Sequence, residues 1–278
     1  MNDKLQPWLP VSKLRKIDIN ISGGAYTYDW AKNHNLLEKK CGEAWVKLHT
    51  VFILEPIEIR MHKDGNIEYR TTEEYNKNHR SDFHTDFGMF HSDDMGEFGG
   101  ELILPLGGRL VGNFIDVFDF QNKVYAIDSI RHMMMGNFSL YEFNDASNYR
   151  CLYEVGGFGE RHNESLSFEA YCVTPKGIYI LLSGEVTNES EKDIAYKDKW
   201  ISRLLLVSNG TVEEVIEIKE SFANVQNIIV SGDILYIAAN KMLAIINVLN
   251  GDAQYYTFIN KRAENNLLKV RAAYNQFE

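Results

Sequence analysis

Three segments in the second half of the chain share one pattern of apolar and polar positions. Each has a β-rich run, a polar turn, an aliphatic residue, a tyrosine and then more apolar residues, and they cover 118–128, 172–182 and 230–240. The tyrosines are 54 and 57 residues apart, at Tyr125, Tyr179 and Tyr236. Self-similarity at such intervals is typical of a repeated supersecondary unit.

Each segment lies inside a longer unit of four strand-like runs. The runs are rich in Val, Ile, Tyr and Phe, which favour strands, and turn residues such as Asn209-Gly210 and Asn250-Gly251 connect them. Asn-Gly between apolar runs is a strong hairpin signal. The sequence therefore predicts three units of four antiparallel strands, over 114–156, 165–218 and 222–260.

A repeat of four antiparallel strands predicts an all-β, β-propeller-like fold, because a single four-stranded blade cannot bury both of its faces and radial stacking can. About five blades fit a single domain over 1–278. The blades over 44–113 are irregular, with strands expected at 45–53, 57–62, 66–72, 88–92 and 100–106. The segment 261–278 is either a helix or a closing strand, and a β-sandwich with coincidental spacing is the alternative fold.

Composition narrows the possible environments and partners. The 278 residues carry a net charge of −10 with 45% hydrophobic residues, which suits a packed core and disfavours direct nucleic-acid binding. The start lacks a secretory signal, and the apolar runs are too short for a membrane helix. Three cysteines at unrelated spacings fit a reducing compartment. We expect a cytoplasmic protein without a membrane or nucleic-acid partner.

The stretch FHSDDMGEFGGELILPLGG, residues 90–108, concentrates the candidate chemistry. One interpretation is a metal site, because His84-x-Asp86 and His91-x-Asp93 repeat a spacing that places both side chains on one strand face. A second is a glycosidase or metal-dependent hydrolase that uses carboxylates near 86–101, with Asp94 paired to Glu97 or Glu101. A third is a glycine-rich turn whose acids are either solvated or bind a partner.

Other catalytic motifs are missing from the sequence. There is no phosphate-binding loop, no Gly-x-Ser-x-Gly elbow and no motif beside a cysteine. We therefore assign no catalytic residue, no metal ligand and no cofactor.

The chain resembles bacterial cytoplasmic propeller-like proteins over about 45–260. The features that carry the resemblance are the blade pattern, the run Asp-Asp-Met-Gly-Glu-Phe-Gly-Gly-Glu (93–101), the acidic net charge and the lack of an export signal. Some of these are immunity proteins of contact-dependent growth inhibition and other polymorphic toxin systems. The resemblance implies a non-enzymatic protein that occludes the active site of a cognate toxin, which is a nuclease in many such systems. The expected contact residues are four acids and two aromatic anchors, Asp93, Asp94, Glu97, Glu101, Phe90 and Phe98. A scaffold or sensor propeller is a further alternative.

Overall fold

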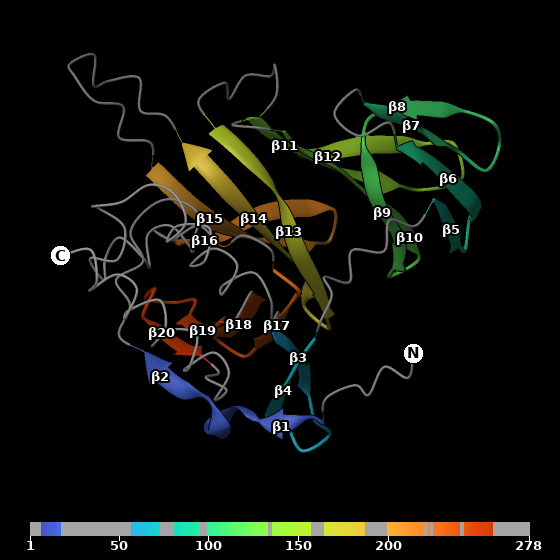
Figure 1. Cartoon of the computed structure of the whole chain (residues 1–278). Coiled ribbons are helices and arrows are strands. Elements are labelled where there is room, and N and C mark those ends of the chain that lie inside the picture. Colours follow the sequence, from blue (N-terminus) through green and yellow to red (C-terminus); the bar gives the residue numbers. More distant parts are fainter. Residues whose placement is uncertain are drawn as a thin grey trace, which may run out of the picture. The chain divides into compact units, whose positions relative to one another are not determined.

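The computed structural model describes residues 7–17, 57–72, 81–94, 99–132, 135–156, 164–186, 199–218, 222, 225–239 and 242–257. These residues form twenty strands and one 3-10 helix, η1 (Val11–Lys13) (Figure 1). The strands make five antiparallel sheets, so the all-β prediction is confirmed. Among the described residues, none forms a helix with the length and apolar character needed to cross a membrane.

The chain divides into two compact units. Unit 1 comprises 1–76, 169–174 and 218–278, and unit 2 comprises 77–168 and 175–217. Strand β13 (Glu164–Thr174) begins in unit 2 and ends in unit 1. The single domain expected over 1–278 stays a prediction.

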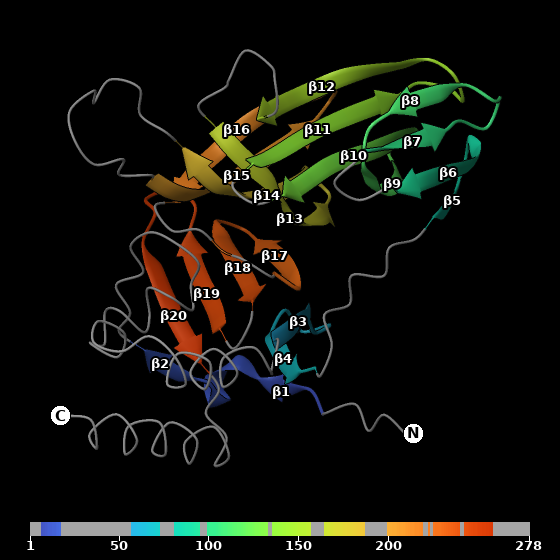
Figure 2. The same ribbon diagram turned by 45° about the horizontal axis from the view of Figure 1, so that its top comes forward.

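Unit 1 contains a three-stranded and a five-stranded sheet. The first has the order β1-β4-β3, with β1 at Leu9–Pro10, β4 at Ile67–Thr71 and β3 at Ile57–Met61. The second has the order β17-β18-β19-β20-β2, with bounds Asn227–Ser231, Ile234–Ala239, Met242–Asn247, Ala253–Thr257 and Arg15–Ile17. Figure 2 shows β17 to β20 side by side in that order. The early strand β2 thus completes a sheet built from the last strands of the chain.

A shared apolar core and one amide side chain join these two sheets. The core contains Ile57 and Ile59 from β3 together with Ala238 from β18 and Leu243 from β19, all buried. The Ile59 backbone N–H donates to Asn227 Oδ1 over 3.0 Å, and Asn227 Nδ2 donates to Ile59 O over 2.6 Å. The Asn227 amide thereby occupies both hydrogen-bonding groups of one β3 residue, as a neighbouring strand would.

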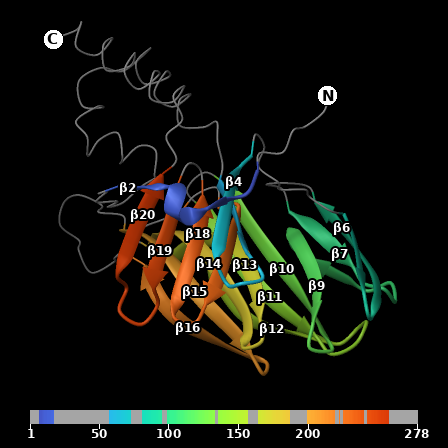
Figure 3. The same ribbon diagram turned by 90° about the horizontal axis from the view of Figure 1, so that it is seen from below.

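Unit 2 contains two complete four-stranded meanders. One has the order β5-β6-β7-β8, with bounds Asp82–Thr85, Gly88–Asp94, Gly100–Ile103 and Arg109–Val111. The other has the order β12-β11-β10-β9, with β9 at Phe114–Phe120, β10 at Lys123–His132, β11 at Met135–Phe143 and β12 at Tyr149–Gly156. Strands β6, β7 and β9 lie next to one another in Figures 1 and 3.

The fifth sheet has the order β13-β14-β15-β16. Its strands in unit 2 are β14 (Gly177–Val186), β15 (Lys199–Ser208) and β16 (Thr211–Ile218). The last residue of β16, Ile218, belongs to unit 1. Every residue from Gly177 to Glu185 is buried, so β14 has both faces covered. The β15–β16 turn places Asn209 at φ 51° and Gly210 at φ 72°. These positive values are those of the tight hairpin that Asn-Gly predicts.

The predicted four-strand units agree with the structure in the second half of the chain. The interval 114–156 contains β9 to β12, and the next two sheets cover 164–218 and 227–257. Gly112 and Asn113 separate β8 from β9, and the Gly112 N–H donates to Gly100 O over 3.0 Å.

The strand expected at 45–53 and the segment 261–278 lie outside the described residues. The arrangement of the sheets around one axis stays a prediction.

Candidate functional site

Strands β6 and β7 carry the described part of the acidic stretch, and their side chains alternate between core and solvent. Phe90 and Leu102 are fully buried, and Ser92 is buried with its hydroxyl donating to Phe114 O over 2.7 Å. The intervening positions include the exposed Asp93 and the partly exposed Glu101. The stretch is therefore a pleated strand pair with one face anchored in the core of unit 2 and one face open.

The structure brings two of the predicted contact acids together. Asp93 lies directly opposite Glu101 in the antiparallel register, and Asp94, the last residue of β6, pairs through its backbone with Gly100. A side chain on Gly100 would collide with Asp93 O, so the close approach of the strands there requires glycine. Glu97 and Phe98 lie outside the described residues.

Phe90 is a core residue, and the prediction that it anchors a partner is wrong. Its side chain has no exposed surface. It packs edge-on against Phe143 with a ring-centroid distance of 5.2 Å, in a cluster that also contains Phe83, Leu102 and Phe114. The physical reason is register, because Phe90 alternates with His91 and the pleat turns it toward β9 and β10.

One ion pair and one histidine–carboxylate hydrogen bond lie on the open face. Arg109 Nη1 donates to both carboxylate oxygens of Glu101, over 2.8 and 3.1 Å, and His91 Nδ1 lies 2.7 Å from Asp82 Oδ1. Arg109 is mostly exposed, so its pair contributes only about 0 to 1 kcal/mol and is weakened by salt. Glu101 is partly neutralised by Arg109, whereas Asp93 keeps an exposed charge.

The two predicted His-x-Asp pairs do not converge. His91 contacts Asp82 on β5, across the strand pair. Asp86 lies in the turn after β5, where its backbone N–H donates to Asp119 Oδ1 over 3.0 Å. Within the described ranges, no group of three or more His, Cys, Asp or Glu side chains is placed to hold a metal ion.

Asp128 is a buried carboxyl group that the sequence did not single out. It lies on β10 at a shift of register between Ile127 and itself, a bulge that re-aims the strand. The Asn113 backbone N–H donates to Asp128 Oδ1 over 2.6 Å. Burial raises the pKa of Asp128 to about 6, this hydrogen bond works in the opposite direction, and the nearby charge of Glu154 adds to the rise.

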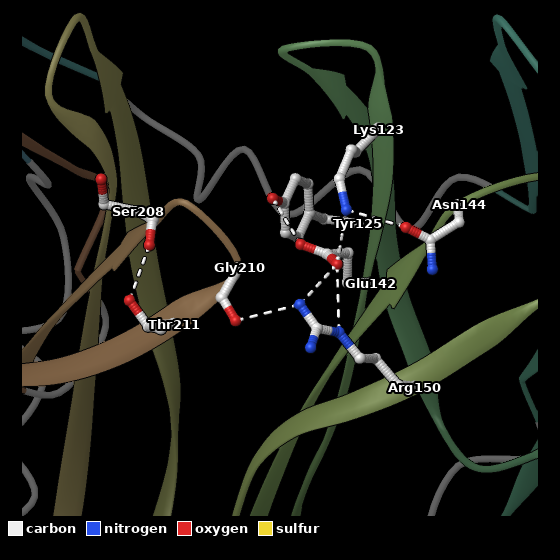
Figure 4. Close-up of polar contacts among 8 residues, drawn as sticks. All are labelled: Lys123, Tyr125, Glu142, Asn144, Arg150, Ser208, Gly210 and Thr211. Carbon is white, nitrogen blue, oxygen red and sulfur yellow. Dashed lines mark hydrogen bonds and ion pairs between the residues drawn. The ribbon is translucent and has the colours of Figure 1, made fainter.

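Glu142 is the centre of a buried polar network in unit 2 (Figure 4). Its fully buried carboxylate accepts hydrogen bonds from Lys123 Nζ over 2.8 Å, Arg150 Nη2 over 2.9 Å and the Tyr125 hydroxyl over 3.1 Å. Burial alone would raise the pKa of Glu142, but these donors outweigh it and the pKa is lowered. Arg150 Nη2 also donates to Gly210 O over 3.1 Å, which ties the β15–β16 turn to this sheet.

A carboxylate with its acceptor positions filled by fixed donors is poorly suited to proton transfer, because moving its proton would break the network. We interpret the Glu142 network as structural. Its two cations, the Tyr125 hydroxyl and the Gly210 carbonyl connect β10, β11 and β12 with the next sheet of unit 2, so it holds two adjacent sheets in one orientation.

The comparisons with known proteins add no family: no protein-family model matches the chain, and no match was found among the curated proteins.

Proposed function

We propose that this protein is a non-enzymatic β-propeller-like binding protein, and most specifically a cytoplasmic immunity protein that occludes the active site of a cognate toxin. The observation that carries the proposal is the β6–β7 strand pair. Asp93 and Glu101 lie side by side on its open face while Phe90 and Leu102 fix its other face in the core. Charged groups on a rigid scaffold bind with little loss of conformational entropy.

The packing of adjacent sheets supports the propeller part of the proposal. In unit 2, the β5–β8 and β9–β12 sheets share one apolar core, and Arg203 of β15 donates to the Tyr153 hydroxyl of β12 over 3.3 Å. In unit 1, β3 packs against β18 and β19 of the last sheet, and β2 pairs with β20. Packing of one sheet on the next within each unit is what stacked blades need, and closure of the blades into a ring is part of the proposal.

Charge supports the choice of partner. The chain carries a net charge of −10, and the cleft of a nuclease is cationic because it binds phosphates. An acidic inhibitor that enters such a cleft gains a faster association and blocks the substrate. The proposed partner is therefore a basic toxin domain, with no direct nucleic-acid or membrane contact.

The test is to capture a partner from the native host with the full chain and then assay it in cells. Expression of the captured protein should arrest growth, and co-expression of this chain should relieve the arrest. A partner without toxicity, or a toxicity that this chain does not relieve, would remove the immunity function.

A matched kinetic experiment tests the acidic contact. The variant Asp93→Lys/Asp94→Lys should associate with the partner more slowly, by roughly tenfold at low salt, and with a weaker salt dependence. The control Glu213→Lys/Asp233→Lys makes the same change of net charge at exposed positions on β16 and in the β17–β18 turn. Equal association rates for both double variants would exclude the β6 end as the contact.

The second candidate function is a glycosidase-like enzyme, and one observation favours it. Asp128 and Glu154 lie in one row of the β9–β12 sheet, each directly opposite Ser139 on β11, and burial raises the pKa of Asp128 to about 6. Paired carboxyl groups, one of them buried, are what acid–base catalysis of glycoside hydrolysis uses. Turnover of a glycoside by the wild type that Asp128→Asn abolishes would establish this candidate over the binding protein.

A further inference from the structure

Residues 7–17 pair with both sheets of unit 1. Strand β1 forms the edge of the three-stranded sheet, with Leu9 opposite Tyr69 of β4. Strand β2 forms the edge of the five-stranded sheet, with Lys16 opposite Tyr256 of β20. Figures 1 and 2 show this segment in blue, beside β4 at one end and beside β20 at the other. We call residues 7–17 the strap.

The strap is an addition to strands that already pair among themselves. Strand β4 also pairs with β3, and β20 also pairs with β19. Strands β17 to β20 form a four-stranded meander like β5–β8 and β9–β12, and β2 joins this meander as a fifth strand. The β3–β4 hairpin and the β17–β20 meander therefore keep their internal ladders when the strap is absent.

Few side chains of the strap reach the core of unit 1. Leu14 is 7% exposed and packs in the cluster that contains Ile59 and Leu243, and Val11 packs partly against the same cluster. In contrast, Leu9 is 40% exposed, and Ser12, Lys13 and Lys16 are exposed. The core residues from β3, β4, β18 and β19 remain together without the strap.

The other anchor of the strap is an aromatic ring. The guanidinium carbons of Arg60 and Arg70 lie 4.4 and 4.6 Å from the centre of the Trp8 ring. Each arginine is held in place by a carboxylate of the opposite strand, because Arg60 Nε donates to Glu68 Oε2 over 2.8 Å and Arg70 Nε donates to Glu58 Oε2 over 2.6 Å. The attraction between cations and the ring fixes the β1 end on the β3–β4 hairpin.

A short turn connects the two anchors. The 3-10 helix η1 lies between β1 and Leu14, and the Leu14 N–H donates to Val11 O over 2.9 Å. We infer that the strap is released as one unit from both sheets while the β3–β4 hairpin and the β17–β20 meander stay folded. Segments with few buried apolar contacts open at a lower free energy than the whole fold. The inference goes beyond the proposed function and does not depend on it.

The docked strap also protects the edges that it covers. Pro10 on β1 has no N–H to donate, and Lys16 places an exposed charge on β2, and both features discourage the pairing of a further strand. Release leaves the backbone groups of β4 and β20 that face the strap without a partner. The strap is therefore a reversible cover for two strand edges.

The experiment measures hydrogen exchange at individual amides of the full chain by NMR, in low concentrations of urea. A local opening exposes little surface and depends weakly on urea, whereas global unfolding depends steeply on it. We expect a weak dependence for the protected amides of β2. The amides of β19, which has paired strands on both sides, should show a steep dependence.

Two substitutions test whether the ends of the strap open together. Trp8→Ala removes the contact with both guanidinium groups, and the amides of β2 on the other sheet should then exchange roughly tenfold faster. Leu14→Ala should accelerate exchange at Leu9 and in β2 alike. The matched control Ser12→Ala changes an exposed side chain of η1 and should alter exchange by less than about twofold. Circular dichroism checks that the sheets persist in each variant.

Three outcomes would overturn the inference. If β2 and β19 show the same urea dependence, the strap opens only with the whole fold. If Trp8→Ala accelerates exchange at Leu9 and leaves β2 at the wild-type rate, the two ends open separately. If Ser12→Ala has as large an effect as Trp8→Ala, the ring is not an anchor.

Discussion

Replacing Asp128 with asparagine should stabilise the protein at neutral pH and leave its stability at pH 4 almost unchanged. The carboxyl group is 6% exposed, and burial raises its pKa from 3.8 to about 6. In the unfolded chain the group keeps its ordinary pKa. Below about pH 3 it is protonated in both states and folding carries no penalty from its charge.

The penalty develops as pH rises. Between about pH 4 and 6 the unfolded chain releases this proton while the folded chain retains it, so the free energy of unfolding falls. Above pH 6 the folded state holds a buried carboxylate, and the accumulated loss is about 3 kcal/mol, because each pKa unit corresponds to about 1.4 kcal/mol. The stability that Asp128 contributes is thus fully present only below its unfolded-state pKa of 3.8, and it is lost as the pH rises through the folded-state pKa of about 6.

Asparagine has nearly the same shape and no ionisable group, and its Oδ1 can still accept from the Asn113 N–H. An amide NH2 group then replaces the second carboxylate oxygen, at a cost of about 1 kcal/mol if its hydrogens find no acceptor. Asp128→Asn should therefore raise the free energy of unfolding at pH 7.5 by about 1 to 3 kcal/mol relative to the wild type.

The assay is urea denaturation of both proteins at pH 4.0 and 7.5, with unfolding monitored by circular dichroism. The informative quantity is the variant-minus-wild-type difference at each pH, because other titrating groups cancel in it. Asp86→Asn is the matched control, since Asp86 is an exposed acid in the same unit. A difference that is the same at both pH values would refute the reasoning, as would an equal pH dependence in the control.

Three further substitutions test the contacts that hold the sheets. Glu142→Gln should lower the free energy of unfolding by about 3 kcal/mol in denaturant titrations, because it leaves two cations beside a neutral buried amide. Asn227→Ala should cost about 2 kcal/mol, since both backbone groups of Ile59 lose their partner, and hydrogen exchange at the Ile59 amide should accelerate. Gly210→Ala should cost about 1 to 2 kcal/mol in thermal melts, because φ is 72° and the added methyl group displaces Arg150.

Each of these three has an outcome that contradicts it. Glu142→Gln with wild-type stability would show that the network is not structural. Asn227→Ala should cost clearly more than Gln254→Ala, a change at an exposed β20 position that is expected to stay within about 0.5 kcal/mol. Gly210→Ala should cost more than an alanine at Gly108, where φ is not in the left-handed region and the nearest atoms belong to the Leu104 side chain.

The sequence determined the secondary structure over most of its second half. The residues around Tyr125, Tyr179 and Tyr236 form short apolar runs that are separated by turn residues, and both signals act between near neighbours. Four strands per unit and their antiparallel order follow from these local preferences. The same signals placed Asp93 and Glu101 near the ends of their strands.

The tertiary structure decided which side chains are available at those positions. Phe90 and His91 are adjacent in an acidic stretch, yet one is fully buried and the other partly exposed, because the face of β6 that packs on β9 and β10 is selected by contacts with distant strands. Asp128 lies in a run of residues that are all buried on β10, and only the tertiary packing shows that its carboxyl group is buried deeply enough to have a raised pKa.

The pairing of β2 with β20 also could not be predicted from local sequence, because more than 230 residues of chain separate the two strands. Arg15 to Ile17 carries no strand signal of its own, and its conformation comes from the free edge of β20. Local sequence specifies φ/ψ preferences and turns, whereas burial, ionisation and edge pairing depend on groups that meet only after folding. For this reason the sequence located the acidic strands, and the structure distinguished their open face from their core face.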